Sequence, residues 1–431
     1  MEIGIIGAGA AGVSVLDALS LADAEPGGVT VFEGSPRWWR GRAYQPDLDA
    51  VRVNAPPVIM SIRHGDRSHY PRWLARRDGD ADAHQDELLG VPIVPRAVYG
   101  EYLEATALEA ITRLRQRGWR VDLVGDRVTG HSPPRTPGGE HPVDHAVLCV
   151  GGGTPVDHYG LAGSRGFVLD PYPLARTLAD VPTGGHVLVI GSGLTAVDIV
   201  AALAADGHTG PITMVSRGGV LPDVQQTPVQ LDFRHLTREN LPSTLTGLVS
   251  LMNAELAEAG QDIAPLTAEI TTRERPVDRL RRQLAEVDSP YLGRRMFAAA
   301  VHMLGPAAWR LLSLAERTVL RTEHFRTITS LASPMVPGNA RTLLALFDSG
   351  QLRLVPGVPK IEPGPRGFRV SSSDDLTADV VLNATNPPTG GLHTVGATTT
   401  DTFFVTPSVP TLAAVAATTV AEILSTRPPA R

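Results

Sequence analysis

Cysteine is almost absent from the sequence: Cys149 is the only one among 431 residues. A single cysteine excludes a framework of disulfide bonds and is typical of a protein in the reducing cytoplasm. Because Cys149 lies in the apolar run HAVLCVGG, we expect a core residue rather than a nucleophile. No histidine has a partner at the spacing of a metal site or catalytic triad, so His302 and His324 are expected to serve packing or the surface. The sequence therefore predicts no metal ligand and no particular catalytic residue.

Long apolar runs and clusters of basic charge are missing as well. The apolar N-terminal run has no basic leader and does not resemble a signal peptide. The run Phe403–Leu424 contains two prolines and Glu422, which disfavours a membrane span. The net charge is −6, and the 39 lysines and arginines form no sustained stripe. We therefore expect a cytoplasmic protein with neither a membrane nor a nucleic-acid partner.

Glycine, in contrast, is abundant, and several glycines form a motif near the N-terminus. Residues 3–6 predict a strand and Val13–Leu19 predict a helix. Val29–Phe32 predict a second strand, which ends at Glu33. The pattern G-x-G-x-x-G between the first strand and the helix, with an acidic residue about twenty residues later, is typical of a dinucleotide-binding βαβ unit. The loop consists of Gly7, Ala8, Gly9, Ala10, Ala11 and Gly12.

Each feature of such a loop has a physical reason. Gly7 permits the tight turn, Gly9 lets the backbone approach a pyrophosphate, and Gly12 lets the helix pack close to the strand. The N-terminus of the helix offers N–H donors and a positive dipole to the phosphates. The carboxylate of Glu33 can accept hydrogen bonds from an adenosine ribose and repels a 2′-phosphate. This first unit therefore suits FAD or NAD rather than NADP.

A second unit of the same kind follows in the middle of the chain. Residues 186–190 predict a strand, 197–205 a helix and 211–216 a further strand. The loop between the first two reads G-x-G-x-x-A, with Gly191, Ser192, Gly193, Leu194 and Thr195 as its first members.

This second unit ends in Ser216 and Arg217 instead of a carboxylate. A guanidinium can bind a 2′-phosphate with two hydrogen bonds and stack on adenine, so NADPH is favoured over NADH. An ordinary surface arginine is the alternative interpretation of Arg217. Two units in one chain allow one to hold FAD and the other to admit NADPH, which reduces the flavin by hydride transfer. The predicted fold class is α/β, with two Rossmann-like dinucleotide-binding domains and a large helical insertion in the second.

The remaining segments give a provisional division of the chain. An FAD-binding domain is expected at 1–160 and 386–431, and an NADPH-binding domain at 161–385. Within the latter, a helical insertion at 225–346 is expected to form a substrate lid or a dimer surface. Further helices are predicted at 70–77, 96–116, 242–259, 276–287, 291–304, 307–321, 340–349 and 410–424, and further strands at 121–128, 144–150, 352–355, 368–370 and 379–382.

Several short segments resemble one known family, the FAD-NAD(P)-binding proteins, which are distantly similar to flavin-dependent N-hydroxylating and Baeyer–Villiger monooxygenases. The resemblance covers both glycine loops and the linker between them. It rests on the runs Gly41-Arg42-Ala43-Tyr44, Val53-Asn54-Ala55-Pro56, Met60-Ser61, Arg72-Trp73-Leu74, Val94-Pro95-Arg96, Tyr99-Gly100-Glu101-Tyr102-Leu103 and GPITMVSRGGVLP.

The resemblance implies positions for the flavin. Asn54 and Met60 would pass close to the isoalloxazine, the loop arginines Arg37, Arg40 and Arg42 could meet phosphate oxygens, and the backbone at Val128 would meet adenine. Trp38 and Trp39 would either cover the dinucleotide or fill the loop. The segments Gly151–Pro155 and Asn383–Pro388 resemble the hinges between the domains, with Asn386 in place of a glycine. The last helix would point its N-terminus at the flavin.

The resemblance also implies an activity, namely FAD- and NADPH-dependent hydroxylation of a small molecule by molecular oxygen through a flavin C4a-hydroperoxide. The linker Gly166–Pro173 lacks the histidine-containing fingerprint of Baeyer–Villiger enzymes, which leaves nitrogen as the favoured position. Such an enzyme suits secondary metabolism, and a homodimer is compatible with it. Two alternatives stay open: an NADPH oxidoreductase or dehydrogenase without oxygen insertion, and a non-catalytic dinucleotide-binding protein.

Overall fold

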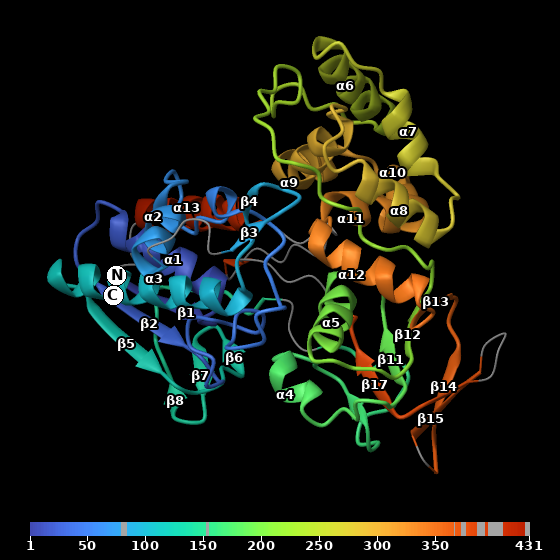
Figure 1. Cartoon of the computed structure of the whole chain (residues 1–431). Coiled ribbons are helices and arrows are strands. Elements are labelled where there is room, and N and C mark those ends of the chain that lie inside the picture. Colours follow the sequence, from blue (N-terminus) through green and yellow to red (C-terminus); the bar gives the residue numbers. More distant parts are fainter. Residues whose placement is uncertain are drawn as a thin grey trace.

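The computed structural model describes residues 1–78, 84–151, 155–365, 367–371, 376–385, 393–394 and 408–426. Two five-stranded sheets lie side by side and organise the chain (Figure 1). The first sheet has the order β18-β9-β1-β2-β5. Its strands β1, β2, β5 and β9 are parallel, whereas β18 is antiparallel to β9. The strand bounds are β1 (Glu2–Ile6), β2 (Gly28–Phe32), β5 (Arg120–Val124), β9 (His145–Leu148) and β18 (His393–Thr394).

Three helices cover one side of the first sheet, namely α1 (Ala10–Leu21), α3 (Arg96–Gln116) and α13 (Val409–Ser425) (Figure 1). Apolar residues of α1, α3 and α13 share one core with the sheet. The helix α13, from the end of the chain, therefore completes a layer that the first 124 residues begin. The small sheet β6 (Gly130–His131), β7 (Pro134–Thr136) and β8 (Gly139–Glu140) lies on the other side.

The second sheet has the order β10-β17-β11-β12-β13 and is entirely parallel. The helices α5 and α12 pack against this sheet and against each other, and α4 contacts α5. The bounds are β10 (Phe167–Val168), α4 (Leu174–Leu178), β11 (Val187–Ile190), α5 (Leu194–Ala205), β12 (Ile212–Ser216), α12 (Pro337–Asp348), β13 (Leu352–Pro356) and β17 (Val380–Asn383).

The two sheets repeat the same topology. The series β9-β1-β2-β5 of the first corresponds to β17-β11-β12-β13 of the second, and in both the glycine loop follows the strand in the second place of the series. A three-stranded antiparallel sheet precedes the first strand of each series: β6–β8 in the first, and β14 (Lys360–Gly364), β15 (Gly367–Ser371) and β16 (Leu376–Ala378) in the second. The predicted α/β class with two Rossmann-like units is confirmed. The domain boundaries at 160/161 and 385/386 stay a proposal.

The crossovers from β2 to β5 and from β12 to β13 differ between the two units. The first contains η1 (Pro57–Ile59), α2 (His69–Asp78), the hairpin β3 (Gln85–Asp86) and β4 (Val91–Pro92), and then α3. The second contains a group that we call the insertion helices, followed by α12 (Figure 1). The insertion helices are α6 (Leu245–Glu258), α7 (Ala264–Thr271), α8 (Pro276–Ala285), α9 (Gly293–Leu311), α10 (Leu314–Val319), the π-helical turn η2 (Leu320–His324) and α11 (Phe325–Ala332).

Most predicted elements are present, but two predictions are wrong, namely the break near Pro306 and the end of the strand over 121–128. The expected break near Pro306 does not occur, because Leu304, Ala308 and Trp309 are buried on one face of α9 and keep the helix continuous through the proline. The break falls instead at Ser313, whose side chain forms a capping box with Glu316 at the start of α10. The strand expected over 121–128 ends at Val124. The expected helix 340–349 begins earlier, at Pro337, and belongs to the second sheet as α12.

Among the described helices, none combines the length and apolar character that crossing a membrane requires.

Candidate dinucleotide-binding sites

The first glycine loop joins β1 to α1 at the carboxyl edge of the first sheet. Helix α1 begins after Gly9, and no described side chain caps its first N–H groups. Uncapped N–H groups at a helix N-terminus are ready donors for phosphate oxygens. The loop therefore has the arrangement that a pyrophosphate requires.

Two glycines of this loop make contacts that leave no room for a side chain. Gly7 has φ +105°, and a Cβ there would lie 2.5 Å from the carbonyl oxygen of Cys149. A Cβ on Gly12 would lie 2.1 Å from the carbonyl oxygen of Gly7. Gly12 thus allows α1 to approach the loop closely, as expected from the sequence.

Glu33 lies directly after β2 and faces the same loop. Its carboxylate accepts hydrogen bonds from the N–H of Ala8 at 3.0 Å and from the N–H and hydroxyl of Ser35 at 3.0 and 2.7 Å. The side chain is therefore held at the end of the strand, beside the glycine loop, where an adenosine ribose would be placed in this fold.

The segment after Glu33 returns over the glycine loop. Gly41 has φ +59°, and its Cα would lie 3.4 Å from a Cβ on Gly9. Trp39 also has positive φ, at 67°, and its ring is buried in the core beside that of Trp38. Of the two predicted roles of this pair, Trp39 therefore fills the loop.

Two of the three loop arginines contact carboxylates. Arg40 forms an ion pair with Glu104 at 2.7 Å, and Arg42 forms one with Asp170 at 2.9 Å. The Nη2 atom of Arg42 is buried without a hydrogen-bond partner among the described residues. Arg42 therefore retains a donor that a ligand phosphate could use, whereas Arg37 lines a separate cavity of about 410 Å³ near α4.

A cluster of tyrosines holds the segment that the resemblance places near the isoalloxazine. The Tyr99 hydroxyl donates to the carbonyl oxygen of Met60 at 3.0 Å, and the N–H of Ile62 donates to the Tyr102 hydroxyl at 3.0 Å. The rings of Tyr99 and Tyr102 lie 5.5 Å apart, and both pack against Tyr70. Burial raises the pKa of both hydroxyls, that of Tyr102 to about 12, so they stay protonated.

Asn54, at the start of that segment, carries a further unsatisfied group. Its Oδ1 atom is buried and has no hydrogen-bond partner among the described residues. A buried carbonyl oxygen without a donor is costly in an interior. A flavin, which has ring N–H donors, would supply one. Together with the uncapped loop, the positions of Asn54 and Glu33 fit FAD.

Two further positions are expected to contact the flavin, namely Val128 and the N-terminus of α13. Val128 is half-buried in the turn between β5 and β6. The N-terminus of α13 is capped by Ser408, whose Oγ accepts a hydrogen bond from the N–H of Thr411. The expectations for Gly152–Thr154 and for Asn386 lie outside the described residues.

The second glycine loop joins β11 to α5 and repeats these features. Gly191 has φ +122°, a Cβ there would lie 3.1 Å from the carbonyl oxygen of Ala384, and α5 begins after Gly193 without a described side-chain cap. The Ser192 hydroxyl lies 2.8 Å from both the Ser216 hydroxyl and the carbonyl oxygen of Val220. These contacts fix the segment after β12 against the loop. The Ser216 hydroxyl is therefore used within the protein, and it also accepts from the N–H of Gly219.

The loop residues that follow Gly193 differ in exposure. Leu194 packs partly against the core of the second unit, and Thr195 is buried. Arg217, in contrast, is exposed, and among the described residues its guanidinium has no ion-pair partner. It is therefore free to bind an anion at the end of β12.

An ion pair that is largely removed from solvent connects the two units. Arg96, at the start of α3, lies 2.7 Å from Asp198 of α5, and it also donates to the Tyr172 hydroxyl at 2.9 Å. The Tyr172 hydroxyl in turn donates to Asp198. Burial opposes the charge of Arg96, but the attraction of Asp198 outweighs it and raises the pKa of Arg96. The sequence does not reveal this cluster, because its partners are distant along the chain.

The structure places Cys149 in the core, as expected, and His302 against a backbone carbonyl. Cys149 is buried, and burial raises the pKa of its thiol, which keeps it an unreactive core residue. His302 is largely buried against the carbonyl oxygen of Ala332 at 2.7 Å, and burial lowers its pKa. Within the described part of the chain, no group of three histidine, cysteine or acidic residues could hold a metal ion.

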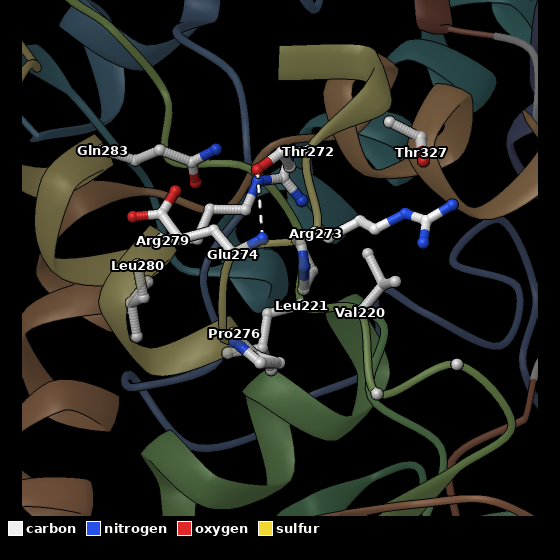
Figure 2. A pocket seen from close by; sticks show the side chains of 13 residues that line it. Val220, Leu221, Thr272, Arg273, Glu274, Pro276, Arg279, Leu280, Gln283 and Thr327 are labelled. Carbon is white, nitrogen blue, oxygen red and sulfur yellow. Dashed lines mark hydrogen bonds between the residues drawn. The ribbon is translucent and has the colours of Figure 1, made fainter. Parts of the chain in front are cut away.

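A cavity of about 230 Å³ lies beside the second site, between the segment that follows β12 and the insertion helices (Figure 2). Val220 and Leu221 line one side, and Arg279, Leu280 and Gln283 of α8 line another. Nearby, the Asp223–Arg294 ion pair at 3.0 Å is buried, and burial raises the pKa of Asp223 to about 6.

The fold and these loops define a class: proteins with two dinucleotide-binding units in one chain. Residues 4–153, which include the whole first glycine loop, match the family model described as FAD-NAD(P)-binding. The resemblance noted in the sequence is thereby confirmed. A search of curated proteins found no match.

Solved structures with the same fold include an ornithine hydroxylase and a cyclohexanone monooxygenase. The reduced form of ornithine hydroxylase from Pseudomonas aeruginosa has a TM-score of 0.53 and 14% identity, with 98% of this chain and 99% of that chain covered. An open structure of cyclohexanone monooxygenase has a TM-score of 0.50 and 13% identity, with 98% and 87% covered. At this identity the similarities establish the fold, which extends over nearly the whole chain.

Proposed function

We propose that this protein is an FAD- and NADPH-dependent monooxygenase that hydroxylates a small molecule, with nitrogen as the favoured position. The observation that carries the proposal is that the chain contains the same βαβ unit twice, on two sheets of the same strand order. In each unit the helix after the glycine loop has no side-chain cap at its N-terminus. The first unit ends at Glu33, and the second ends at Arg217. The carboxylate suits the ribose of FAD, and the free guanidinium suits a 2′-phosphate.

The roles of the protein residues follow from the site. The first loop and Glu33 would hold the adenosine and pyrophosphate of FAD, while Asn54 and the segment fixed by Tyr99 would contact the ring system. When bound, FAD supplies hydride transfer from NADPH and the reaction with oxygen, whereas the protein supplies position and exclusion of water. This division of labour is consistent with the absence of a predicted nucleophile–base pair in the sequence.

Two comparisons support the choice of reaction. Two proteins with this fold are named as an ornithine hydroxylase and a cyclohexanone monooxygenase. The linker Gly166–Pro173 lacks the histidine expected of Baeyer–Villiger enzymes. We therefore favour hydroxylation at nitrogen over a Baeyer–Villiger reaction.

The proposal is tested on the purified holoprotein in two steps. First, NADPH is added without oxygen, and the visible flavin spectrum is recorded; bleaching is expected. Second, isotopically labelled oxygen is admitted with a panel of primary amines, and the products are analysed by mass spectrometry.

A labelled hydroxylamine product is the expected result. Flavin reduction followed only by release of hydrogen peroxide, with every amine of the panel, would instead indicate an oxidoreductase without oxygen insertion. A protein that binds flavin but is not reduced by NADPH would contradict the proposal altogether.

A further inference from the structure

A second arginine lies beside Arg217, and it comes from the insertion helices. Arg326 is the second residue of α11, and its Cγ lies 3.9 Å from the position that a Cβ on Gly218 would occupy. The side chain of Arg326 therefore packs over the residue that follows Arg217. The surrounding protein, and then the positive charge of Arg217, lower the pKa of Arg326.

Neither guanidinium has a counter-ion among the described residues. Two exposed arginines at α8 do have one: Arg275 contacts Asp278 at 2.6 Å, and Arg281 contacts Asp348 at 2.5 Å. Two adjacent positive charges repel each other unless an anion lies between them. A phosphate group with a double negative charge is a suitable anion, because guanidinium groups bind phosphate oxygens in a bidentate manner.

Open space adjoins the pair. Gly218 and Thr327, the residues that follow the two arginines in the sequence, both line the cavity of Figure 2. Arg273, on the turn before α8, extends toward the side of this cavity where Thr327 lies. The pair is therefore at the rim of a cavity that a ligand can enter, and the rim carries additional positive charge.

The chain immediately before α11 has an unusual geometry. The π-helical turn Leu320–His324 joins α10 to α11 and changes the direction in which the following residues face. Single π-helical turns are frequent at functional sites. Here the turn precedes Arg326 by two residues.

From these observations we propose that the insertion helices form the second half of the coenzyme site, with Arg326 and Arg217 together binding the 2′-phosphate of NADPH. This inference rests on the proposed use of NADPH, and it assigns the choice of coenzyme to two parts of the chain. The Rossmann-like unit contributes one arginine at the end of β12, and α11 contributes the other.

The test measures the binding of 2′,5′-ADP and of 5′-ADP to the flavin-loaded protein by isothermal titration calorimetry. Arg326→Gln is compared with Arg217→Gln and with Arg310→Gln, which removes the same charge from an exposed position at the end of α9. Because hydrogen bonds to charged groups are strong, we expect Arg326→Gln to weaken 2′,5′-ADP binding about tenfold or more. The binding of 5′-ADP should change less than about twofold, since 5′-ADP lacks the group that the arginine contacts.

Four other results would overturn either the role of Arg326 or the assignment of NADPH. Unchanged 2′,5′-ADP binding in Arg326→Gln, with weaker binding in Arg217→Gln, would overturn the inference and leave the proposed function intact. Equal weakening in Arg326→Gln and Arg310→Gln would also overturn it, because general charge would then explain the effect. If Arg217→Gln has no effect either, the assignment of NADPH itself fails. Inorganic phosphate serves as a further ligand, and competition by it at the same concentrations as 2′,5′-ADP would indicate a general anion site and contradict the coenzyme assignment.

Discussion

At the scale of single residues, the glycines of the two loops fall into two kinds. A Cβ on Gly12 would collide with the carbonyl oxygen of Gly7 at 2.1 Å, whereas a Cβ on Gly193 would meet no atom of the described residues within 4 Å. The backbone of Gly193 has φ −85°, which any residue can adopt. Gly12 is therefore required by the packing of the protein itself, whereas the space at Gly193 is available to a ligand.

This difference gives a prediction for two matched substitutions. Gly12→Ala should lower the thermal midpoint and the flavin content of the purified protein, because overpacking costs about 1–3 kcal/mol and moves α1 away from β1. Gly193→Ala should leave both unchanged and raise the KM for NADPH, because the added methyl occupies space needed by the pyrophosphate. Differential scanning fluorimetry, the flavin-to-protein absorbance ratio and steady-state kinetics measure these effects. A normal KM in Gly193→Ala would contradict the placement of NADPH at the second loop.

At the scale of elements, the contact between α3 and α5 fixes one unit against the other. The side chains of Arg96 and Asp198 are 11% and 1% exposed. Arg96 begins α3, which packs on the first sheet, and Asp198 lies in α5 of the second unit. The adjacent loop adds further bonds: Asp47 accepts hydrogen bonds from the N–H groups of Leu174 and Ala175 at 2.9 and 2.7 Å. Together with the Arg42–Asp170 pair, these contacts hold the linker and α4 against the first unit.

We predict that Arg96→Met lowers the free energy of unfolding by about 3 kcal/mol or more, because it leaves the buried carboxylate of Asp198 without its ion-pair partner. Arg120→Met is the matched control, since Arg120 pairs with Glu2 at 2.5 Å but its side chain is 60% exposed. Exposed pairs contribute about 0–1 kcal/mol, so this variant should resemble the wild type. Urea unfolding followed by tryptophan fluorescence measures both.

The double variant Arg96→Met/Asp198→Leu provides the second half of this test. If the loss in Arg96→Met comes from an unpaired buried charge, removing that charge as well should restore part of the stability. Equal or greater destabilisation in the double variant would show that lost packing, rather than the unpaired carboxylate, explains the effect.

The sequence predicted those elements whose signals are local. The glycine loops, the strands beside them and the long helix α3 were all recognisable from spacing and apolar periodicity. The short hairpins β6–β8 were not, because strands of two or three residues carry no periodic pattern. Pro306 predicted a helix break that does not exist, because burial of its neighbours outweighs the missing hydrogen bond.

Partners distant in the sequence were also beyond reach. Arg42 was assigned to phosphate, and the structure shows its ion pair with Asp170, which is 128 residues away. The sequence does not identify Arg326 as a candidate phosphate ligand, because the residues next to it in the sequence do not distinguish it from other helical arginines. Its proximity to Arg217 depends on the path of the whole insertion. The sequence thus predicts which loops would bind nucleotides, but not which side chains meet there.

At the scale of the whole molecule, the insertion helices contact both units. Arg326 of α11 lies beside the second glycine site. At the other unit, the Thr411 hydroxyl of α13 donates a hydrogen bond to the carbonyl oxygen of His302 in α9 at 3.1 Å. Binding of coenzyme at Arg326 would therefore act on a group of helices that also touches the expected flavin domain.

We accordingly predict that NADP⁺ slows backbone hydrogen exchange in α11 and in residues 217–222 of the flavin-loaded protein, because a ligand that bridges them stabilises both against local opening. The helices α6 and α7 have neither arginine and should exchange as before. Mass spectrometry of peptides after exchange in the presence and absence of NADP⁺ measures this, with Arg326→Gln as the matched variant. In that variant the protection of α11 should be lost while that of α5 persists. Protection confined to α5 and β12 in the wild type would show that the insertion helices take no part in binding the coenzyme.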